Sequence, residues 1–104
     1  MNKRIRLESK YDVMLRSILR QRLADTNIKV YMFGSRISGK VKPASDIDLA
    51  LDGGKKLNNL KIISLLKNDF EESDIKYSVD IIDLRDTDKN FKKHIVADLV
   101  EIKY

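Results

Sequence analysis

Two aspartates separated by one residue, Asp46 and Asp48, lie in an apolar run that begins ten residues after a Gly-Ser pair. The run predicts a strand, and side chains on a strand alternate between its two faces, so both carboxylates share one face. Ile47, Leu49 and Leu51 then share the other face, where they can enter a core. A chain with this pattern must build a sheet that has one apolar and one acidic face.

Neighbouring carboxylates repel each other, and a purely structural strand gains nothing from that repulsion. A divalent cation removes it, and Mg²⁺ is normally held by carboxylate oxygens together with substrate phosphates. The turn Gly34-Ser35 follows the apolar run 30–33 and offers backbone N–H groups and a hydroxyl to a phosphate. The pattern therefore indicates a site for a metal ion and a phosphate. The alternative is an ordinary turn followed by a solvated edge strand, with Ala50 and Asp52 on the acidic face.

Length and composition narrow the class of protein. A chain of 104 residues supports one modest core, so we expect a single domain over residues 1–104. The apolar runs are too short to cross a bilayer and the basic N-terminus precedes no apolar signal core, so we expect a cytoplasmic protein with no membrane partner. With no cysteine and one histidine, zinc sites built on thiolates or several histidines are excluded.

Charge is distributed unevenly along the chain. Residues 1–42 carry eleven Lys or Arg and three Asp or Glu, whereas residues 43–104 carry ten and thirteen. A basic first part suits nucleic acid, the phosphates of a nucleotide or an acidic protein partner. It is also what a solvated helix face would look like.

Helical and strand-like periodicities divide the chain into a short series of elements. The expected helices are 9–25, 57–72 and 87–102, and the expected strands are 28–33, 46–51 and 75–84. Ser9 is the expected cap of the first helix, and the last helix has an apolar stripe that would face the core or a partner: Phe91, Ile95, Leu99 and Ile102. One helical turn over 35–39, closed by Gly39, and a loop over 40–45 separate the first two strands. We therefore expect an α+β (α/β-like) fold, in which helices cover mainly one face of a small mixed sheet of about three strands.

The expected third strand contains Asp80 among apolar neighbours, where an unpaired carboxylate is costly to bury. If this strand lies beside the second, Asp80 joins Asp46 and Asp48 on the face away from the helices. Three converging carboxylates suit one Mg²⁺ ion, or two ions about 3.5–4 Å apart. Asp83 would point to the opposite face near the strand end, as a solvated or capping residue.

These motifs resemble the signature of the DNA polymerase beta-like nucleotidyltransferase superfamily, which is Gly-Ser, ten residues, Asp-x-Asp and a later acidic residue on a strand. Within it, Phe33-Gly34-Ser35-Arg36, Gly39 and Ser45-Asp46-Ile47-Asp48-Leu49 are similar to the minimal nucleotidyltransferases (MNT) of bacteria and archaea. The segment 79–84 resembles the third-strand motif of that group. The resemblance runs from about residue 28 to residue 84 and implies the nucleotidyltransferase fold.

The resemblance also implies an activity, the transfer of a nucleoside monophosphate to a hydroxyl with release of pyrophosphate. It implies that Gly34 and Ser35 bind a nucleoside triphosphate, with ATP as the expected substrate. Asp46 and Asp48 would bind Mg²⁺, and Asp80 would complete the catalytic and metal-binding set. The protein's part in such chemistry is mainly to position groups and neutralise charge.

Two further residues beside these motifs are candidates for nucleotide binding. Arg36 directly follows the Gly-Ser turn, where its alternative role is a surface salt bridge, and Ser45 directly precedes the aspartates.

The MNT group further implies an antitoxin that transfers AMP to a tyrosine of a HEPN-domain toxin, its expected partner. The chain would form a homo-oligomer or, together with this partner, a hetero-oligomer. Two alternatives stay open: an antitoxin that neutralises its partner by binding alone, and a catalytic subunit that modifies a small molecule or an RNA end with acceptor recognition supplied in trans.

Overall fold

The computed structural model describes residues 4–55 and 61–104, in which strands and helices alternate along the chain. The strands are β1 (Lys29–Phe33), β2 (Ile47–Asp52), β3 (Val79–Asp83) and β4 (Val100–Ile102). The helices are α1 (Ser9–Leu23), α2 (Ser35–Ser38), α3 (Lys61–Glu71) and α4 (Lys89–Ile95), with 3₁₀ turns η1 (Leu84–Asp86) and η2 (Val96–Asp98). The predicted start of the second helix, 57–60, lies outside the described residues.

The strands form one mixed sheet in the order β3-β2-β1-β4. β1 pairs antiparallel with both β2 and β4, and β2 pairs parallel with β3. The parallel pair needs a crossover, and α3 provides it. The expected placement of the third strand beside the second is therefore confirmed.

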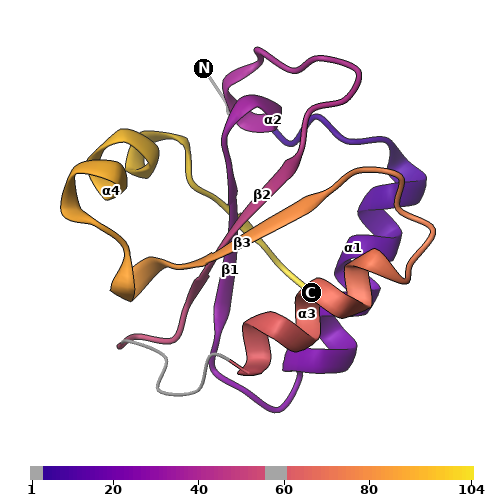
Figure 1. Ribbon diagram of the computed structural model, residues 1–104, viewed down its shortest axis with the longest axis horizontal. Helices are drawn as coiled ribbons and strands as arrows, with labels where there is room; N and C mark the ends of the chain where they lie inside the picture. Colours follow the sequence, from indigo (N-terminus) through magenta and orange to yellow (C-terminus); the bar gives the residue numbers. More distant parts are fainter. Residues whose placement is uncertain (1–3, 56–60) are drawn as a thin grey trace.

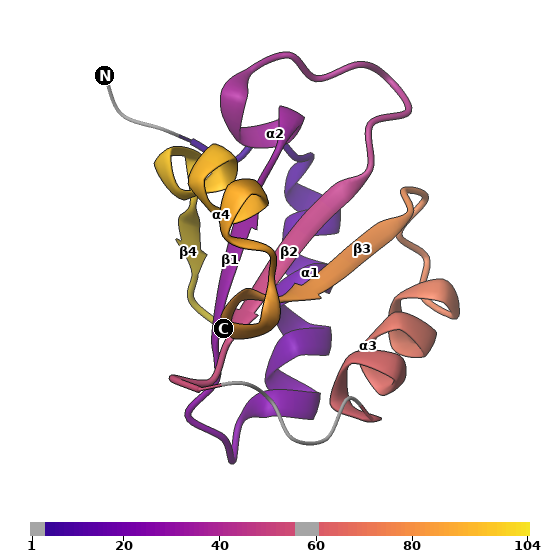
Figure 2. The same cartoon turned by 60° about the vertical axis from the view of Figure 1, so that its left-hand side comes forward.

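The two long helices lie on one face of the sheet, where the main core forms. In Figure 2, α1 lies behind the sheet and α3 lies beside β3. The apolar face of β2 predicted from its alternation, Ile47, Leu49 and Leu51, is fully buried there. Helical spacing brings the buried side chains of α1 onto this face: Tyr11, Leu15, Leu19 and Leu23.

A second, smaller core lies on the opposite face, under α4. Ile95 of α4 is buried in one cluster with Phe33, Ala50 and Leu84. Figure 1 shows α4 beyond the end of β3, and in Figure 2 it lies in front of β1, on the side away from α1. The acidic face is therefore partly covered by a helix, in addition to the expected helices on the other face.

The prediction of one continuous C-terminal helix over 87–102 is wrong. α4 ends at Ile95, η2 follows, and residues 100–102 form β4 against β1. Ile102 pairs with Val30 and is 1% exposed, because it joins the main core from the sheet. Pairing β4 with β1 also satisfies backbone groups that a helix would leave at an open sheet edge. The sheet consequently has four strands in place of about three.

Two smaller sequence expectations also have clear outcomes. Ser9 is the first helical residue of α1 and not its cap, a position that Glu8 occupies without a side-chain hydrogen bond. Gly39 closes α2 in the left-handed conformation, as predicted. Within the described residues, none of the helices combines the length and apolar character needed to cross a membrane.

Candidate active site

The parallel pairing of β2 and β3 places two acidic residues side by side. Asp48 and Asp80 are direct partners in the β2–β3 register, so their side chains leave the same face of the sheet. Phe33 is the partner of Asp48 on β1 and lies on that face too. This is the face opposite the main core, where the sequence predicted the carboxylates.

Asp46 precedes the first residue of β2 and is exposed. Its charge nevertheless reaches Asp48. Burial raises the pKa of Asp48 to about 6, the negative charges of Asp80 and Asp46 add to this rise, and the positive charge of Arg36 opposes it. Asp48 therefore experiences the negative charge of both other carboxylates.

Gly34 lies directly against this acidic group. It precedes α2 with φ +83° and ψ −157°, a conformation that residues with side chains rarely adopt. A Cβ built on Gly34 would overlap Oδ2 of Asp48 and would lie 3.3 Å from its Cγ. The absence of a side chain at this turn thus allows backbone and carboxylate to approach closely. Ser35 begins α2 beside it.

An open groove of about 590 Å³ runs over this face. One part of its lining is polar, from Gly34, Asp48 and Asp80, and Lys67 of α3 also lines it. Apolar side chains line the remainder: Phe33, Ile81, Ile82, Phe91 and Ile95. A ligand with a charged end and a flat apolar end fits such a lining.

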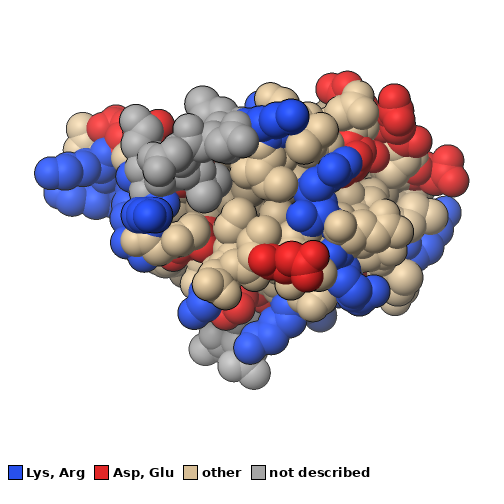
Figure 3. All heavy atoms as spheres, turned by 90° about the horizontal axis from the view of Figure 1, so that it is seen from below, with Lys and Arg blue, Asp and Glu red and all other residues tan. Residues whose placement is uncertain are grey.

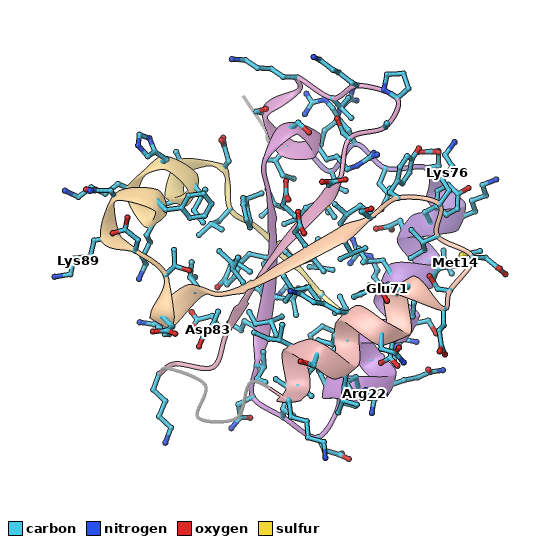
Figure 4. All side chains as sticks on the ribbon, in the orientation of Figure 1. Met14, Arg22, Glu71, Lys76, Asp83 and Lys89 are labelled. Carbon is cyan, nitrogen blue, oxygen red and sulfur yellow. The ribbon has the colours of Figure 1, made fainter. Side chains whose placement is uncertain are left out.

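Asp80 and Asp83 differ in a way that the sequence only partly predicted. Asp80 is exposed, because β3 is an outer strand of the described sheet, so the expected cost of burying it does not arise. Asp83 is 7% exposed, not solvated, and its carboxylate accepts a hydrogen bond from the backbone N–H of Arg85. It therefore caps η1, at the end of β3 that leads to α4 (Figure 4).

The acidic face has the donors that Mg²⁺ prefers, but it does not enclose an ion. Among the described residues, no three acidic or histidine side chains lie close enough together to form a complete metal-binding group. Mg²⁺ is usually held by one or two carboxylates, with the remaining oxygens supplied by substrate phosphates and water. The neighbouring carboxylates of Asp48 and Asp80, with the raised pKa of Asp48, fit such a partial site.

Arg36 and Ser45, predicted to bind nucleotide, have other partners. Arg36 is 2% exposed, and its guanidinium donates hydrogen bonds to the carbonyl oxygens of Ser45 and Arg6. The hydroxyl of Ser45 accepts a hydrogen bond from the N–H of Lys42. A surface salt bridge is thus the wrong description of Arg36, because the side chain is buried and donates to backbone carbonyls.

With this geometry established, comparison with known proteins identifies the family. The sequence profile of the family described as "Polymerase beta, Nucleotidyltransferase" matches residues 7–103. The chain belongs to this family. The match contains the Gly-Ser turn, Asp46, Asp48 and Asp80, so the nucleotidyltransferase motifs and the acidic groove coincide.

A homologue and several solved structures agree with this family. The chain is 36% identical over 89 residues to the probable protein adenylyltransferase MntA of Haemophilus influenzae, covering 86% of this chain and 75% of that protein. A mutant of the toxin–antitoxin pair MntA–HpeT superposes with a TM-score of 0.65 at 21% identity, covering 88% of this chain and 71% of that one. A Shewanella oneidensis complex of tri-AMPylated HEPN toxin with MNT antitoxin gives a TM-score of 0.59 at 20% identity, with 93% and 72% covered.

These comparisons confirm the nucleotidyltransferase fold and the relationship to MNT proteins. The sequence reasoning missed two residues of this nucleotidyltransferase's groove. Helical spacing predicts that Phe91 faces the core or a partner, yet it is 44% exposed and lines the groove. Lys67 carries no sequence signal that separates it from other helix-surface lysines, and only the fold brings it beside Asp80.

Proposed function

We propose that this nucleotidyltransferase uses Mg²⁺ to transfer AMP from ATP to a tyrosine hydroxyl of a HEPN-domain toxin, and that it acts as the antitoxin of that toxin in the cytoplasm. The observation that carries the proposal is the β2–β3 register, which brings Asp48 and Asp80 together on one face beside Gly34. A phosphate and a carboxylate-bound cation can meet there.

We infer that the nucleotide would lie along the groove. The triphosphate would lie at the Gly34-Ser35 turn, and the adenine would lie against the apolar lining near Phe91. Asp48 and Asp80 would hold the cation, and Asp46 would add negative charge beside them. When bound, Mg²⁺ would neutralise charge on the phosphates and on the attacking oxygen.

The chemistry of the transfer is a single displacement at phosphorus. The acceptor oxygen forms a bond to the α-phosphorus while the bond from that phosphorus to the bridging oxygen breaks, and pyrophosphate leaves. Asp80 is exposed and lines the groove, so an acceptor could reach it, and it would take the hydroxyl proton.

Two similarities support a protein acceptor. The homologue from Haemophilus influenzae is described as a probable protein adenylyltransferase, and it is 36% identical to this chain. The similar Shewanella oneidensis structure contains an AMPylated HEPN toxin together with its MNT antitoxin. Another structure of the same fold, a toxin–antitoxin with AMP-PNP (TM-score 0.62, 21% identity), supports ATP as the donor.

Basic side chains could help to receive a charged substrate or partner. Figure 3, which views the molecule from below, shows Lys and Arg side chains at the left-hand end. This is the side of the molecule on which α4 lies in Figure 1. Helix α4 carries Lys89, Lys92 and Lys93, and these three line a small apolar hollow with Val96. Such a surface would attract phosphates or an acidic protein surface.

The proposal is tested by incubating the chain with α-labelled ATP, Mg²⁺ and the product of the neighbouring gene, where we expect the HEPN-domain partner to be encoded. Label should appear on the partner with the wild-type chain and not with Asp46→Asn/Asp48→Asn. The matched control, Asp12→Asn/Asp69→Asn, makes the same charge change at two surface ion pairs and should retain transfer. A partner that is neutralised without label would overturn the enzymatic proposal in favour of binding alone.

A further inference from the structure

The buried guanidinium of Arg36 connects segments that are far apart in sequence. Its Nη2 and Nε donate to the carbonyl oxygen of Ser45 at 2.7 and 3.2 Å, and its Nη1 donates to the carbonyl oxygen of Arg6 at 2.8 Å. The centre of the guanidinium lies 3.9 Å from the centroid of the Tyr77 ring. One side chain therefore contacts the N-terminal segment, the loop before β2 and the segment before β3.

The N-terminal segment returns these contacts. The backbone N–H of Arg6 donates to the carbonyl oxygen of Arg36 at 2.9 Å, and Nη1 of Arg6 donates to that of Ile37 at 2.7 Å. The hydroxyl of Tyr77 lies 2.7 and 2.9 Å from the carboxylate oxygens of Glu8. Tyr77 is thus held in place under Arg36.

The segments held in this way carry the proposed catalytic groups. Arg36 immediately follows the Gly34-Ser35 turn, and Ser45 immediately precedes Asp46. The guanidinium consequently spans from the turn that would bind phosphate to the strand that would bind the cation. The N–H of Ile47 also donates to the carbonyl oxygen of Ser78, which ties the start of β2 to the segment before β3.

We propose that Arg36 is a positioning residue for nucleotidyl transfer, which fixes the Asp46–Asp48 segment at the correct separation from the Gly34-Ser35 turn. This inference rests on the proposed function. Arg36 acts through the backbone of Ser45 and not through contact with the nucleotide. Tyr77 supports it by stacking on the guanidinium.

The chemistry of this contact requires arginine. A planar guanidinium can donate to two carbonyl groups in different directions while one of its faces stacks on an aromatic ring. A lysine ammonium carries the same charge but cannot do all three at once. Substitution by lysine therefore separates positioning from phosphate binding, because a phosphate contact needs mainly the positive charge.

The experiment compares Arg36→Lys and Arg36→Met with the wild type, and uses Arg22→Lys as the control. Arg22 also donates two hydrogen bonds from its guanidinium, to the Asp69 carboxylate between α1 and α3, on an exposed surface. Steady-state AMP transfer to the HEPN partner is measured as kcat and as KM for ATP. Hydrogen exchange of the 40–47 backbone amides is measured without nucleotide or partner.

Positioning predicts that both Arg36 variants lose about 100-fold in kcat, a loss typical of a misplaced catalytic group, with KM for ATP changed less than threefold. Exchange over 40–47 should accelerate at least tenfold in both, while α1 and α3 stay protected. Arg22→Lys should match the wild type in kcat and in loop exchange. Tyr77→Phe should retain most activity, because its ring still stacks on Arg36, whereas Tyr77→Leu should resemble Arg36→Lys.

An Arg36→Lys variant with normal kcat, raised KM for ATP and unchanged exchange over 40–47 would overturn the inference and favour a phosphate contact. Unfolding of α1 and α3 along with the loop would also overturn it, since the role would then be general stability. Wild-type chain that transfers no AMP would refute the proposed function alone, because the exchange measurement needs neither nucleotide nor partner.

Discussion

Gly34 and Asp48 lie so close together that any side chain on Gly34 would overlap the Asp48 carboxylate. The contact joins the turn after β1 to the acidic position on β2, and it depends on the left-handed backbone of Gly34 as well as on its missing Cβ. The two halves of the sequence signature are therefore one packed unit, in which changes to the turn act directly on the carboxylate.

Gly34→Ala should lower the free energy of unfolding by about 2–3 kcal/mol and abolish transfer, because it adds a steric overlap to an unfavourable φ. Gly54→Ala is the matched control: Gly54 also has φ +83°, but its added Cβ would meet no atom within 4 Å. It should cost only about 1 kcal/mol. Thermal or urea unfolding of the two variants measures the difference, and equal losses would show that the overlap with Asp48 is relieved at no cost.

The raised pKa of Asp48 predicts a pH-dependent stability. Its pKa rises from 3.8 to about 6 on folding, so between these values the folded state binds more protons than the unfolded state. Stability should therefore fall as pH rises through this window and stay lower above pH 6. Asp48→Asn should be more stable than the wild type at pH 7.5 by about 1–2 kcal/mol, allowing for solvent screening, with no advantage at pH 3.5.

Mg²⁺ should stabilise the folded wild type above pH 6, since it binds the ionised carboxylates and offsets their repulsion. Added Mg²⁺ should raise the melting temperature at pH 7.5, removal with a chelator should reverse the rise, and neither Asp48→Asn nor the wild type at pH 4 should respond. A response that survives in Asp48→Asn would place the ion elsewhere.

Asp80→Ala and Asp83→Ala should separate catalysis from stability within one strand. Asp80 is exposed in the groove, so its loss should reduce transfer at least 100-fold with little change in melting temperature. Asp83 caps η1, so its loss should cost about 0.5–2 kcal/mol of stability while each folded molecule keeps its activity. Transfer assays normalised to folded protein test this, and loss of activity in both variants would contradict the assignment.

Phe91→Ala should weaken nucleotide binding without altering the chemical step. The Phe91 ring packs edge-on against Phe33, with 6.1 Å between centroids, and presents an exposed face to the groove. We expect KM for ATP to rise about tenfold at constant kcat, because the lost contact would stabilise the bound substrate and the transition state equally. Val13→Ala, which removes an exposed apolar side chain of α1 outside this groove, should leave KM unchanged.

The sequence predicted those features that depend on local spacing. The alternation around Asp48 correctly gave both faces of β2, and the same alternation placed Asp80 and Asp83 on opposite faces of β3. The left-handed Gly39 and the single turn of α2 also followed from neighbouring residues. Each of these features is set within a few positions of the chain.

Features that depend on distant partners could not be predicted in this way. The spacing of Leu99 and Ile102 fits a helix, but pairing with β1 outweighs that local pattern. The role of Arg36 is invisible in sequence because its partners, Arg6, Ser45 and Tyr77, meet only in the fold. The exposure of Asp80 follows from strand order, which periodicity does not specify.

Because Asp48 pairs directly with Asp80, the number of residues inserted into β3 decides on which face of the sheet Asp80 lies. Inserting a single residue into β3 just before Asp80 would turn its carboxylate toward the main core, while an insertion of two would return it to the groove side. The loop between Gly39 and Ser45 is bound by no such odd-or-even rule, because its side chains do not alternate between sheet faces. Odd and even changes of length in that loop should therefore be tolerated alike as long as Arg36 still reaches Ser45, whereas a shift of one position in the third strand should dismantle the site.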